Sequence, residues 1–214
     1  VSIPDSADLT PPLAISVEAW VRPDSLAGSR TILSKYDSSD GGGGTSFNIS
    51  WDLRSEGGRL QFGVYEGGDP ARIELSDAVV LTAEAWQHVA ATFDVATQEI
   101  RIYLNGALVP ASLLYDSIIA DIQDSNTPVR IGAIVNSAGT TTNFWDGLID
   151  EPAIYSRALD AAEIQAIHSL GGAAKGRNVI QGNYIGLNMA GTVDLANNVG
   201  VVLTGGAAGN LIGT

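Results

Sequence analysis

The segment from Tyr36 to Gly44 is rich in oxygen atoms that could hold a metal ion, with the sequence YDSSDGGGG. Asp37 and Asp40 provide carboxylates, and the two serines between them provide hydroxyl groups. Because calcium accepts about six to eight oxygen ligands in flexible geometry, the segment could bind it, with Asp37 as the favoured ligand. The spacing and terminal glutamate of an EF-hand are absent. A glycine-rich loop tip without a ligand is the alternative interpretation.

Arg101, Tyr103 and Tyr65 have the chemistry that sugar recognition needs. Arg101 and Tyr103 alternate with Ile102 along one predicted strand, and Tyr65 follows Val64 on another. Side chains alternate between the two faces of a strand, so all three are predicted to point away from the core. Flat rings cover the C–H faces of sugars, and polar groups nearby bind the hydroxyls. Tyrosines on the outer faces of strands are also common in proteins without a ligand.

Catalytic chemistry finds little support in the sequence. The chain has two histidines: His88 lies inside a predicted strand, where we expect it to be hydrogen-bonded, and His168 lies in the last turn of a predicted helix. Cysteine is absent, which excludes disulfides, thiolate zinc sites and cysteine nucleophiles. Serine-hydrolase, P-loop and zinc-protease motifs are also absent. We therefore predict a protein that is not an enzyme within these residues.

The charge of the chain limits its partners. The 214 residues carry a formal net charge of −13, which would repel a phosphate backbone, so we expect no nucleic acid partner. An acidic surface permits divalent cations and neutral ligands such as sugars, although it also serves solubility alone. No apolar run approaches the roughly 20 residues that span a membrane. The chain begins at Val1 and not at Met, and we expect both ends to continue into a longer protein.

Short alternating segments indicate an all-β fold. Apolar residues recur at every second position in five places, which is the pattern of half-buried strands, within residues 15–21, 47–53, 60–64, 89–93 and 100–104. Asn105-Gly106 predicts a tight hairpin turn, because both residues tolerate positive φ. Ser55-Glu56-Gly57-Gly58 predicts another turn. The spacing of strands and turns predicts a two-sheet antiparallel sandwich.

One short helix is predicted near the end of this sandwich. Asp160 can cap it, and Glu163 follows three residues later, which is the pattern of a capping box. Gly171-Gly172 is predicted to stop it. We therefore place the sandwich domain at residues 1–172.

Residues 173–214 differ in composition from the rest of the chain. Short apolar runs bounded by glycine or asparagine resemble the opening rungs of a right-handed parallel β-helix, especially Gly182-Asn183-Tyr184-Ile185-Gly186 and Gly209-Asn210-Leu211-Ile212-Gly213. Rungs of this kind need stacked neighbours to bury their faces. We predict a linker followed by the first rungs of a β-helix that continues in the full-length protein.

Several motifs of residues 1–170 occur in the order of one known family, namely Val1-Ser2-Ile3-Pro4, Trp20 to Pro23, Trp86-Gln87-His88-Val89-Ala90, Tyr103-Leu104-Asn105-Gly106 and Gly147-Leu148-Ile149-Asp150-Glu151. With these motifs the chain resembles the laminin-G-like, concanavalin A-like lectin/glucanase jelly roll. The resemblance implies a jelly-roll sandwich that binds carbohydrate or a partner. Related glucanases carry a Glu-x-Asp-x-x-Glu motif on one strand, and this sequence lacks it.

The resemblance also implies a role for Asp150. Related jelly rolls often hold a structural calcium ion through an aspartate near the last strand, and Asp150 occupies the matching position. Alternation puts Asp150 on the same face as Leu148, which we expect to be the core side, where a carboxylate must be paired or bound to metal. Hydrogen bonds from turn amides are the alternative. The family's aromatic positions imply that Trp20, Trp86 and Trp145 lie in the core or at its edge, and Trp51 is also expected to be buried.

We therefore expect a calcium-stabilised module of a secreted or cell-surface bacterial protein that binds a glycan or a cell-surface protein. It would precede a β-helix domain in the full-length chain. One alternative is an accessory domain of a β-helix enzyme that degrades polysaccharides. Another is a structural adhesin or stalk spacer without a small ligand.

Overall fold

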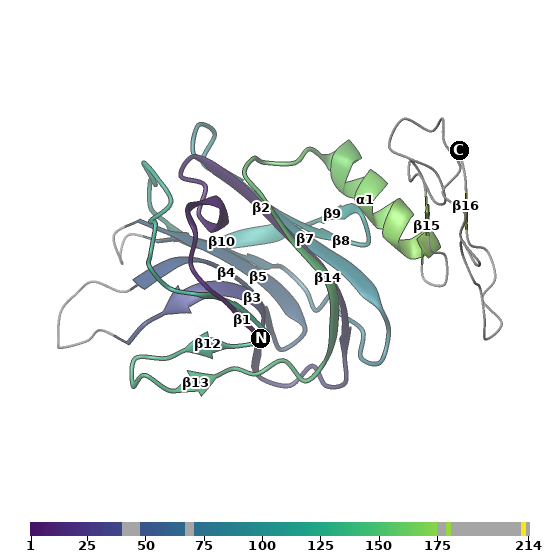
Figure 1. Ribbon diagram of the computed structural model, residues 1–214, viewed down its shortest axis with the longest axis horizontal. Coiled ribbons are helices and arrows are strands. Elements are labelled where there is room, and N and C mark those ends of the chain that lie inside the picture. Colours follow the sequence, from purple (N-terminus) through teal and green to yellow (C-terminus); the bar gives the residue numbers. More distant parts are fainter. Residues whose placement is uncertain (40–47, 67–70, 175–178, 181–210, 213–214) are drawn as a thin grey trace, which may run out of the picture. The chain divides into compact units, whose positions relative to one another are not determined.

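A computed structural model describes residues 1–39, 48–66, 71–174, 179–180 and 211–212. The chain divides into two compact units, residues 1–166 and residues 167–214. The first unit is a sandwich of two β-sheets, as the sequence predicted (Figure 1). No helix among the described residues is both long enough and apolar enough to span a bilayer.

The larger sheet has nine strands, and its main path runs in the order β1-β11-β3-β4-β5-β6-β10. Its strands are β1 (Ser2–Ile3), β3 (Ser29–Asp37), β4 (Asn48–Glu56), β5 (Arg59–Tyr65), β6 (Ala71–Ser76), β10 (Ala111–Asp116), β11 (Val129–Ile131), β12 (Ile134–Val135) and β13 (Thr141–Thr142). A 3-10 turn, Ala7–Leu9, follows β1.

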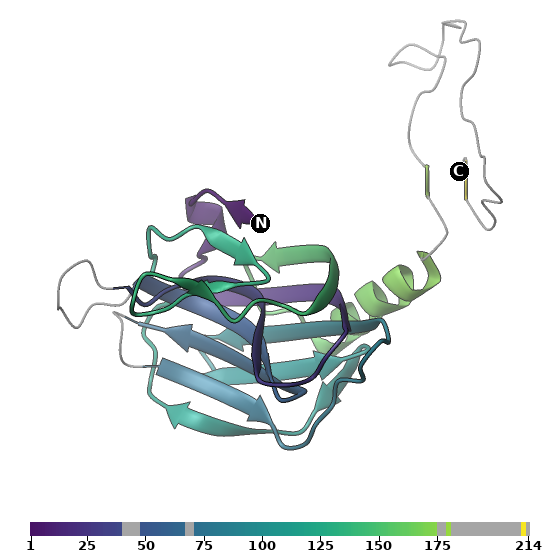
Figure 2. The ribbon, with the colours of Figure 1, turned by 90° about the horizontal axis from the view of Figure 1, so that it is seen from below.

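The smaller sheet has five strands in the order β14-β2-β7-β8-β9 and lies against the larger one (Figure 2). Its strands are β2 (Ala14–Pro23), β7 (Gln87–Asp94), β8 (Glu99–Leu104), β9 (Ala107–Val109) and β14 (Gly147–Tyr155). Strand β14 pairs antiparallel with β2, although more than a hundred residues separate them, and it forms one edge of the sheet. This order of strands is consistent with a jelly roll.

The core lies between the two sheets and follows the alternation of the strands. The inward residues of β2 are completely buried, and those of β7 and β8 continue the same layer, as expected: Ile15, Val17, Ala19, Val21, Val89, Ala91, Phe93 and Ile102. Trp51 is fully buried, and its Nε1 donates a hydrogen bond to the Leu9 carbonyl at 3.1 Å. Trp20 is also buried, whereas Trp86 and Trp145 are half-buried, so the predicted core or core-edge positions of the tryptophans are confirmed.

One predicted alternation is interrupted. Ile49 and Trp51 were expected on one face, but a register shift where β3 pairs with β4 separates them. Trp51 enters the main core, and Ile49 packs instead with Tyr65, Ala71 and Ile73 in a separate cluster. A bulge of this kind adds a residue to one strand and reverses the faces beyond it. Glycine and proline, which often mark a bulge or a break in a strand, do not occur between Asn48 and Glu56.

Two hairpins confirm the predicted turns. Asn105 and Gly106 join β8 to β9 with φ values of 50° and 79°. Gly57 and Gly58 join β4 to β5 with φ values of 60° and 84°. Positive φ at both central positions gives the twist that adjacent antiparallel strands require.

Helix α1 (Ala161–Ala174) begins with the predicted capping box. The backbone N–H of Glu163 donates to Asp160 Oδ1 at 2.9 Å, and the N–H of Asp160 donates to Glu163 Oε2 at 3.0 Å. Hydrogen bonds from Arg157 and then from the Asp160 backbone lower the pKa of Glu163 to about 2. The predicted stop at Gly171-Gly172 is wrong, because the helix continues to Ala174. Glycine within a helix costs only about 1 kcal/mol, so it does not by itself end one.

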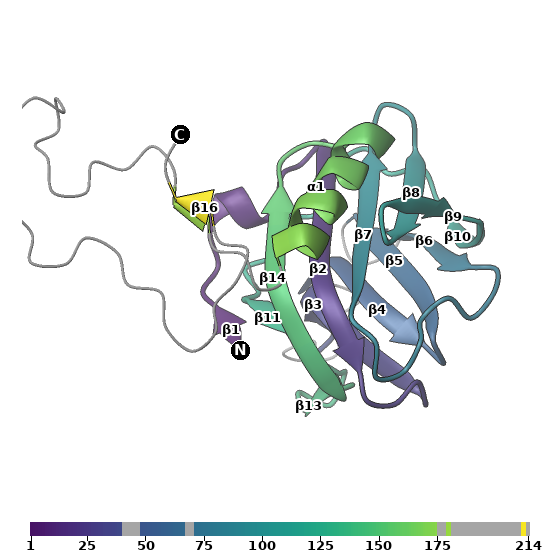
Figure 3. The ribbon, with the colours of Figure 1, turned by 90° about the vertical axis from the view of Figure 1, so that its right-hand side faces the viewer.

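The outer face of the smaller sheet holds His88, which is hydrogen-bonded as the sequence predicted. His88 is fully buried, and its Nε2 lies 2.8 Å from Glu18 Oε2. Figure 3 shows β14, β2, β7 and β8 side by side, with the start of α1 over this face. Ser16 fixes the chain that leads into α1, since its hydroxyl donates to the Arg157 carbonyl at 2.7 Å and accepts from the Leu159 N–H at 2.8 Å.

In the second unit, β15 (Val179–Ile180) pairs in parallel with β16 (Leu211–Ile212). The other predicted rungs lie outside the described residues, including the Gly182–Gly186 motif. The β-helix and the domain boundary at residue 172 therefore stay predictions.

Candidate functional site

The predicted site residues are divided between the two sheets. Asp37 and Tyr65 belong to β3 and β5 of the larger sheet. Arg101, Tyr103 and Asp150 belong to β8 and β14 of the smaller one. The structure therefore brings Asp37 and Tyr65 into one region and separates them from the other three.

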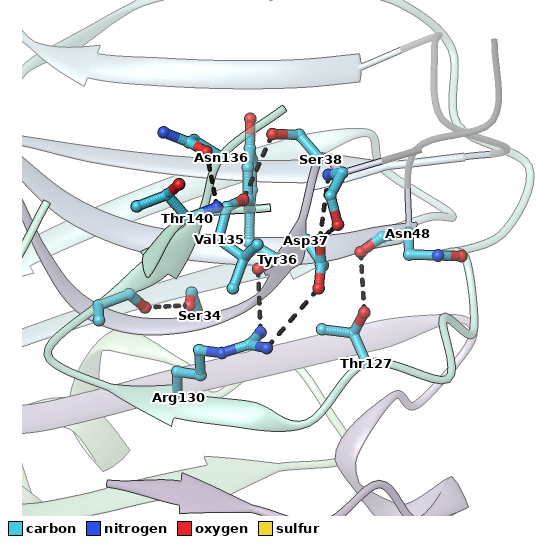
Figure 4. Close-up of polar contacts among 12 residues, drawn as sticks. Ser34, Tyr36, Asp37, Ser38, Asn48, Thr127, Arg130, Val135, Asn136 and Thr140 are labelled. Atoms are coloured by element: carbon cyan, nitrogen blue, oxygen red, sulfur yellow. Dashed lines mark hydrogen bonds and ion pairs between the residues drawn. The ribbon is translucent and has the colours of Figure 1, made fainter. Parts of the chain in front are cut away.

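Asp37 ends β3 and lies beside a guanidinium group from β11. Its Oδ1 accepts hydrogen bonds from the backbone N–H of Ser39 at 3.0 Å and from the Ser39 hydroxyl at 2.5 Å. Its Oδ2 lies 3.7 Å from Nη2 of Arg130, and Nη1 of Arg130 donates to the Tyr36 carbonyl at 3.3 Å (Figure 4). The register places Asn48 of β4 opposite Asp37. We call Tyr36, Asp37, Asn48 and Arg130 the Asp37 rim.

Backbone hydrogen bonds hold the Asp37 rim in place. The Ser38 N–H donates to the Val135 carbonyl at 3.0 Å, and the Thr127 hydroxyl donates to the Asn48 carbonyl at 3.2 Å. Asn136 closes the neighbouring turn, because its Oδ1 accepts from two backbone N–H groups (Figure 4). Asn48 is exposed, and the other three rim side chains are half-buried, so ligands can reach a prearranged set of polar groups.

Tyr65 packs against Tyr36, one of the rim residues. It does point away from Phe62 and Val64, as predicted, but it is only 7% exposed. Its hydroxyl donates to Asp52 Oδ1 at 3.1 Å, and Asp52 Oδ2 accepts from Arg54 Nε at 2.5 Å. The rings of Tyr36 and Tyr65 meet edge-to-face at 6.0 Å. Tyr36, which the sequence offered only as the start of a loop, is thus the ring on this face that is partly open to solvent.

The two tyrosines remain hydroxyl donors over a wide pH range. Burial raises the pKa of Tyr65 well above its ordinary value, and the negative charge of Asp52 adds to this effect. Burial and Asp52 also raise the pKa of Tyr36. A neutral phenol can donate a hydrogen bond through its hydroxyl group.

On the other sheet, Arg101 and Tyr103 have different surroundings. Arg101 is exposed and pairs with Glu99. Tyr103 shares its face, as predicted, but is only 1% exposed, and burial raises its pKa. This corrects the expectation that Tyr103 presents its ring to a ligand. The positive charge of Arg101 opposes this rise of the Tyr103 pKa, and the negative charge of Asp160 adds to it.

Asp150 is correctly expected to share a face with Leu148, but that face is the outer one. Leu148 is 52% exposed, Asp150 is exposed, and Ile149 between them packs against the core. The Asp150 carboxylate accepts a hydrogen bond from the Glu151 N–H at 2.9 Å. The expectation of a carboxylate on the core side is therefore wrong, because the alternation of β14 runs in the opposite sense.

The described donors do not fit a calcium site. Asp37 and Asp150 lie on different sheets, and Asp37 already faces the positive charge of Arg130. Within the described part of the chain, no group of three or more histidine, aspartate or glutamate residues could hold a metal ion. Asp40 lies outside that part.

We expect EDTA to leave the melting temperature unchanged within about a degree compared with calcium buffer, because an ion stabilises a fold only where it binds the folded state, and the described residues contain no cluster of metal ligands. Differential scanning calorimetry in the two buffers measures this. A calcium-dependent rise of several degrees that Asp37→Asn abolishes would contradict the expectation and establish Asp37 as a ligand.

Comparison with solved structures supports the fold. A carbohydrate-binding module, CBM40, of the Ruminococcus gnavus IT-sialidase, bound to alpha2,3 sialyllactose, has 16% identity and a TM-score of 0.60 over 73% of this chain and 83% of that one. A heptameric SAP-like pentraxin from Limulus polyphemus has 15% identity and a TM-score of 0.52 over 78% and 80%. The botulinum neurotoxin serotype G binding domain has 18% identity and a TM-score of 0.54 over 83% and 41%.

Identities this low establish the architecture and leave the ligand open. No curated protein matches the chain. The family comparison is direct, since residues 1–165 match the model described as the concanavalin A-like lectin/glucanases superfamily. That match covers the sandwich built by the two sheets, and the chain therefore belongs to the concanavalin A-like lectin/glucanases superfamily.

Proposed function

We propose that the chain is a non-catalytic carbohydrate-binding module of a secreted or cell-surface protein, and that the Asp37 rim is its binding site. The single observation that carries the proposal is the separation of 3.7 Å between Asp37 Oδ2 and Arg130 Nη2. This distance exceeds a hydrogen bond, so the two groups attract each other without satisfying each other. A sugar hydroxyl between them would donate to the carboxylate and accept from the guanidinium.

The neighbouring residues extend this recognition. Asn48 offers an exposed amide that both donates and accepts hydrogen bonds. The Tyr36 ring packs instead with Tyr65 and with Arg54, whose guanidinium carbon lies 5.8 Å from the ring centre. Tyr36 and Asp37 are consecutive residues of β3, so the ring projects from the other face of the strand than the carboxylate.

The comparisons lend support at the level of fold. Two of the similar structures are the same carbohydrate-binding module with alpha2,3 and alpha2,6 sialyllactose. Others are the receptor-binding domain of botulinum neurotoxin type G and the binding domain of serotype C1. A fold shared with such modules makes binding a reasonable role, while the choice of ligand depends on the residues of this chain.

The proposal is tested by screening the chain on a glycan array that includes both sialyllactoses, followed by isothermal titration of the best ligand. We expect Asp37→Asn to weaken binding at least about tenfold, because a hydrogen bond to a charged group contributes about 1.5–3 kcal/mol. Tyr36→Ala should weaken binding less than Asp37→Asn, because the Tyr36 ring projects from the other face of β3.

Asp150→Asn is the matched control, since it makes the same chemical change on the other sheet and should bind as wild type. All variants are first compared with wild type by thermal melting. Array binding that neither rim variant reduces would place the site elsewhere. Absence of any glycan bound by the wild type would overturn the carbohydrate proposal and favour the structural spacer.

A further inference from the structure

A pocket lies on the side of the sandwich opposite β14. It has a volume of about 390 Å³ and is lined by residues of β6, β8 and β9 and of the segments that flank these strands. We call it the edge pocket, defined by Arg72, Glu74, Glu99, Arg101, Leu108 and Pro110. It shares no residue with the Asp37 rim, so a ligand in the edge pocket would bind independently of the proposed carbohydrate site.

The pairing of β5 with β6 explains why charged residues line this pocket. Glu74 is opposite Phe62, and Arg72 is opposite Val64, in the register of the two strands. Phe62 and Val64 face the core, so Arg72 and Glu74 lie on the same inner face of the sheet. Strand β6 lies next to the last strand of the larger sheet, and its inner face opens at the side of the sandwich.

Most charges around the pocket already have partners, but one does not. Arg72 Nη1 pairs with Asp116, and Arg101 pairs with Glu99. The Glu74 side chain is half-buried, and among the described residues it forms neither a hydrogen bond nor an ion pair. Asp77 adds a further negative charge close enough to act on Glu74. The surroundings therefore hold four carboxylates against two guanidinium groups.

The titration of Glu74 reflects this imbalance. Burial raises the pKa of Glu74 to about 7, Arg72 opposes the rise, and Glu99 and Asp77 add to it. A carboxylate in such a position lacks a compensating positive charge or hydrogen-bond donor. A ligand with a positive charge or a hydrogen-bond donor would provide the partner that the Glu74 carboxylate lacks.

Beside the polar residues Thr97 and Gln98, the pocket has an aliphatic wall. Leu108 is 60% exposed, and Val109 and Pro110 continue the same wall. None of the described residues that line the pocket is aromatic. Sugar rings favour flat aromatic platforms, whereas a chain of methylene groups packs against aliphatic side chains.

We propose that the edge pocket binds the ammonium group of a lysine side chain on a polypeptide partner. Glu74 pairs with the ammonium, and the lysine methylenes lie along Leu108, Val109 and Pro110. The net charge of −13 on the chain favours the approach of a basic partner.

The test uses Nα-acetyl-lysine methylamide as the probe and its norleucine analogue, which keeps the aliphatic chain without the ammonium. Binding is measured by NMR titration at pH 8. We expect the lysine probe to bind wild type in the millimolar range and Glu74→Gln at least about tenfold more weakly. Glu151→Gln, an exposed change on β14, is the matched control and should bind as wild type.

The pH dependence provides a second readout. With a pKa of about 7, Glu74 is mostly ionised at pH 8 and about one-tenth ionised at pH 6, so wild-type affinity should fall roughly tenfold between these values. Arg72, Arg101, Glu99, Asp77 and Asp116 are the charged groups around it. The pKa of Glu74 is about 7 in the folded protein and about 4.5 in the unfolded chain, so ionised Glu74 destabilises the fold as the pH rises from 4.5 through 7. Glu74→Gln removes this ionisation and should therefore melt no lower than wild type at pH 8.

Four results would overturn the proposal. Equal binding of the lysine and norleucine probes would mean that the pocket binds the aliphatic chain and does not recognise the ammonium group. Unchanged binding by Glu74→Gln, or no binding at all at about 10 mM probe, would remove Glu74 from recognition. Tighter binding of glucosamine than of the lysine probe would replace the polypeptide partner with an amino sugar.

Discussion

Replacing Gly147 by alanine is expected to destabilise the sandwich by at least about 3 kcal/mol. Gly147 opens β14 and has a φ of +138°, a conformation that L residues rarely adopt. An added Cβ would lie 2.1 Å from the Arg22 carbonyl oxygen and 2.9 Å from the Asp24 nitrogen. These are backbone atoms, so the clash cannot be relieved by turning a side chain. Strand β14 would have to move away from β2, whose register with it begins at Pro23.

Gly28→Ala separates this clash from simple backbone strain. Gly28 also has a positive φ, +73°, but an added Cβ would meet nothing within 4 Å. We expect this variant to lose only about 1–2 kcal/mol. The free energy of unfolding is measured by urea titration, with tryptophan fluorescence as the signal, since Trp51 is fully buried. Equal losses in the two variants would contradict the packing argument at Gly147.

Replacing Lys35 by alanine is expected to destabilise the fold by about 3–5 kcal/mol. Lys35 lies on β3 and is fully buried. Its Nζ pairs with Asp5 at 2.7 Å, donates to the Ser125 carbonyl and lies 3.8 Å from Asp124. One ammonium thus ties the N-terminal segment and the segment after β10 to the centre of the larger sheet. Truncation removes these contacts and leaves a cavity.

Two further variants separate charge from volume. Lys35→Met keeps most of the volume and should lose about 2 kcal/mol, because Asp5 and the Ser125 carbonyl lose their donor. Asp124→Asn should change the free energy of unfolding by less than about 0.5 kcal/mol, since the Asp124 side chain is 61% exposed and its ion pair with Lys35 is long. The same urea titration measures both. A Lys35→Met variant as stable as wild type would show that the buried charge contributes nothing net.

The candidate sites were only partly predictable from the sequence. The sequence predicted Asp37 as a metal ligand and Tyr65 as part of a sugar-binding face with Arg101 and Tyr103, because a loop rich in oxygen and an alternating strand are local patterns. Arg130 and Asn48 were missed, since neither stands out in its own segment and each meets Asp37 only through strand pairing. Glu74 was missed for the same reason, and its importance depends on which strands leave the side of the sandwich open.

Local patterns in the sequence predicted strands β2, β4, β5, β7 and β8, two hairpin turns and the helix cap. Alternation, positive φ at Asn105-Gly106 and the Asp160–Glu163 pair all act within a few residues, so they can be recognised without a structure. The burial of individual side chains and the pairing of residues far apart in sequence depend on tertiary contacts. A lysine in an alternating strand is buried because a loop carbonyl 90 residues away reaches it. Tyr103 is buried and Asp150 is exposed. The packing of neighbouring elements, and not the strand itself, determines which face of a strand meets solvent.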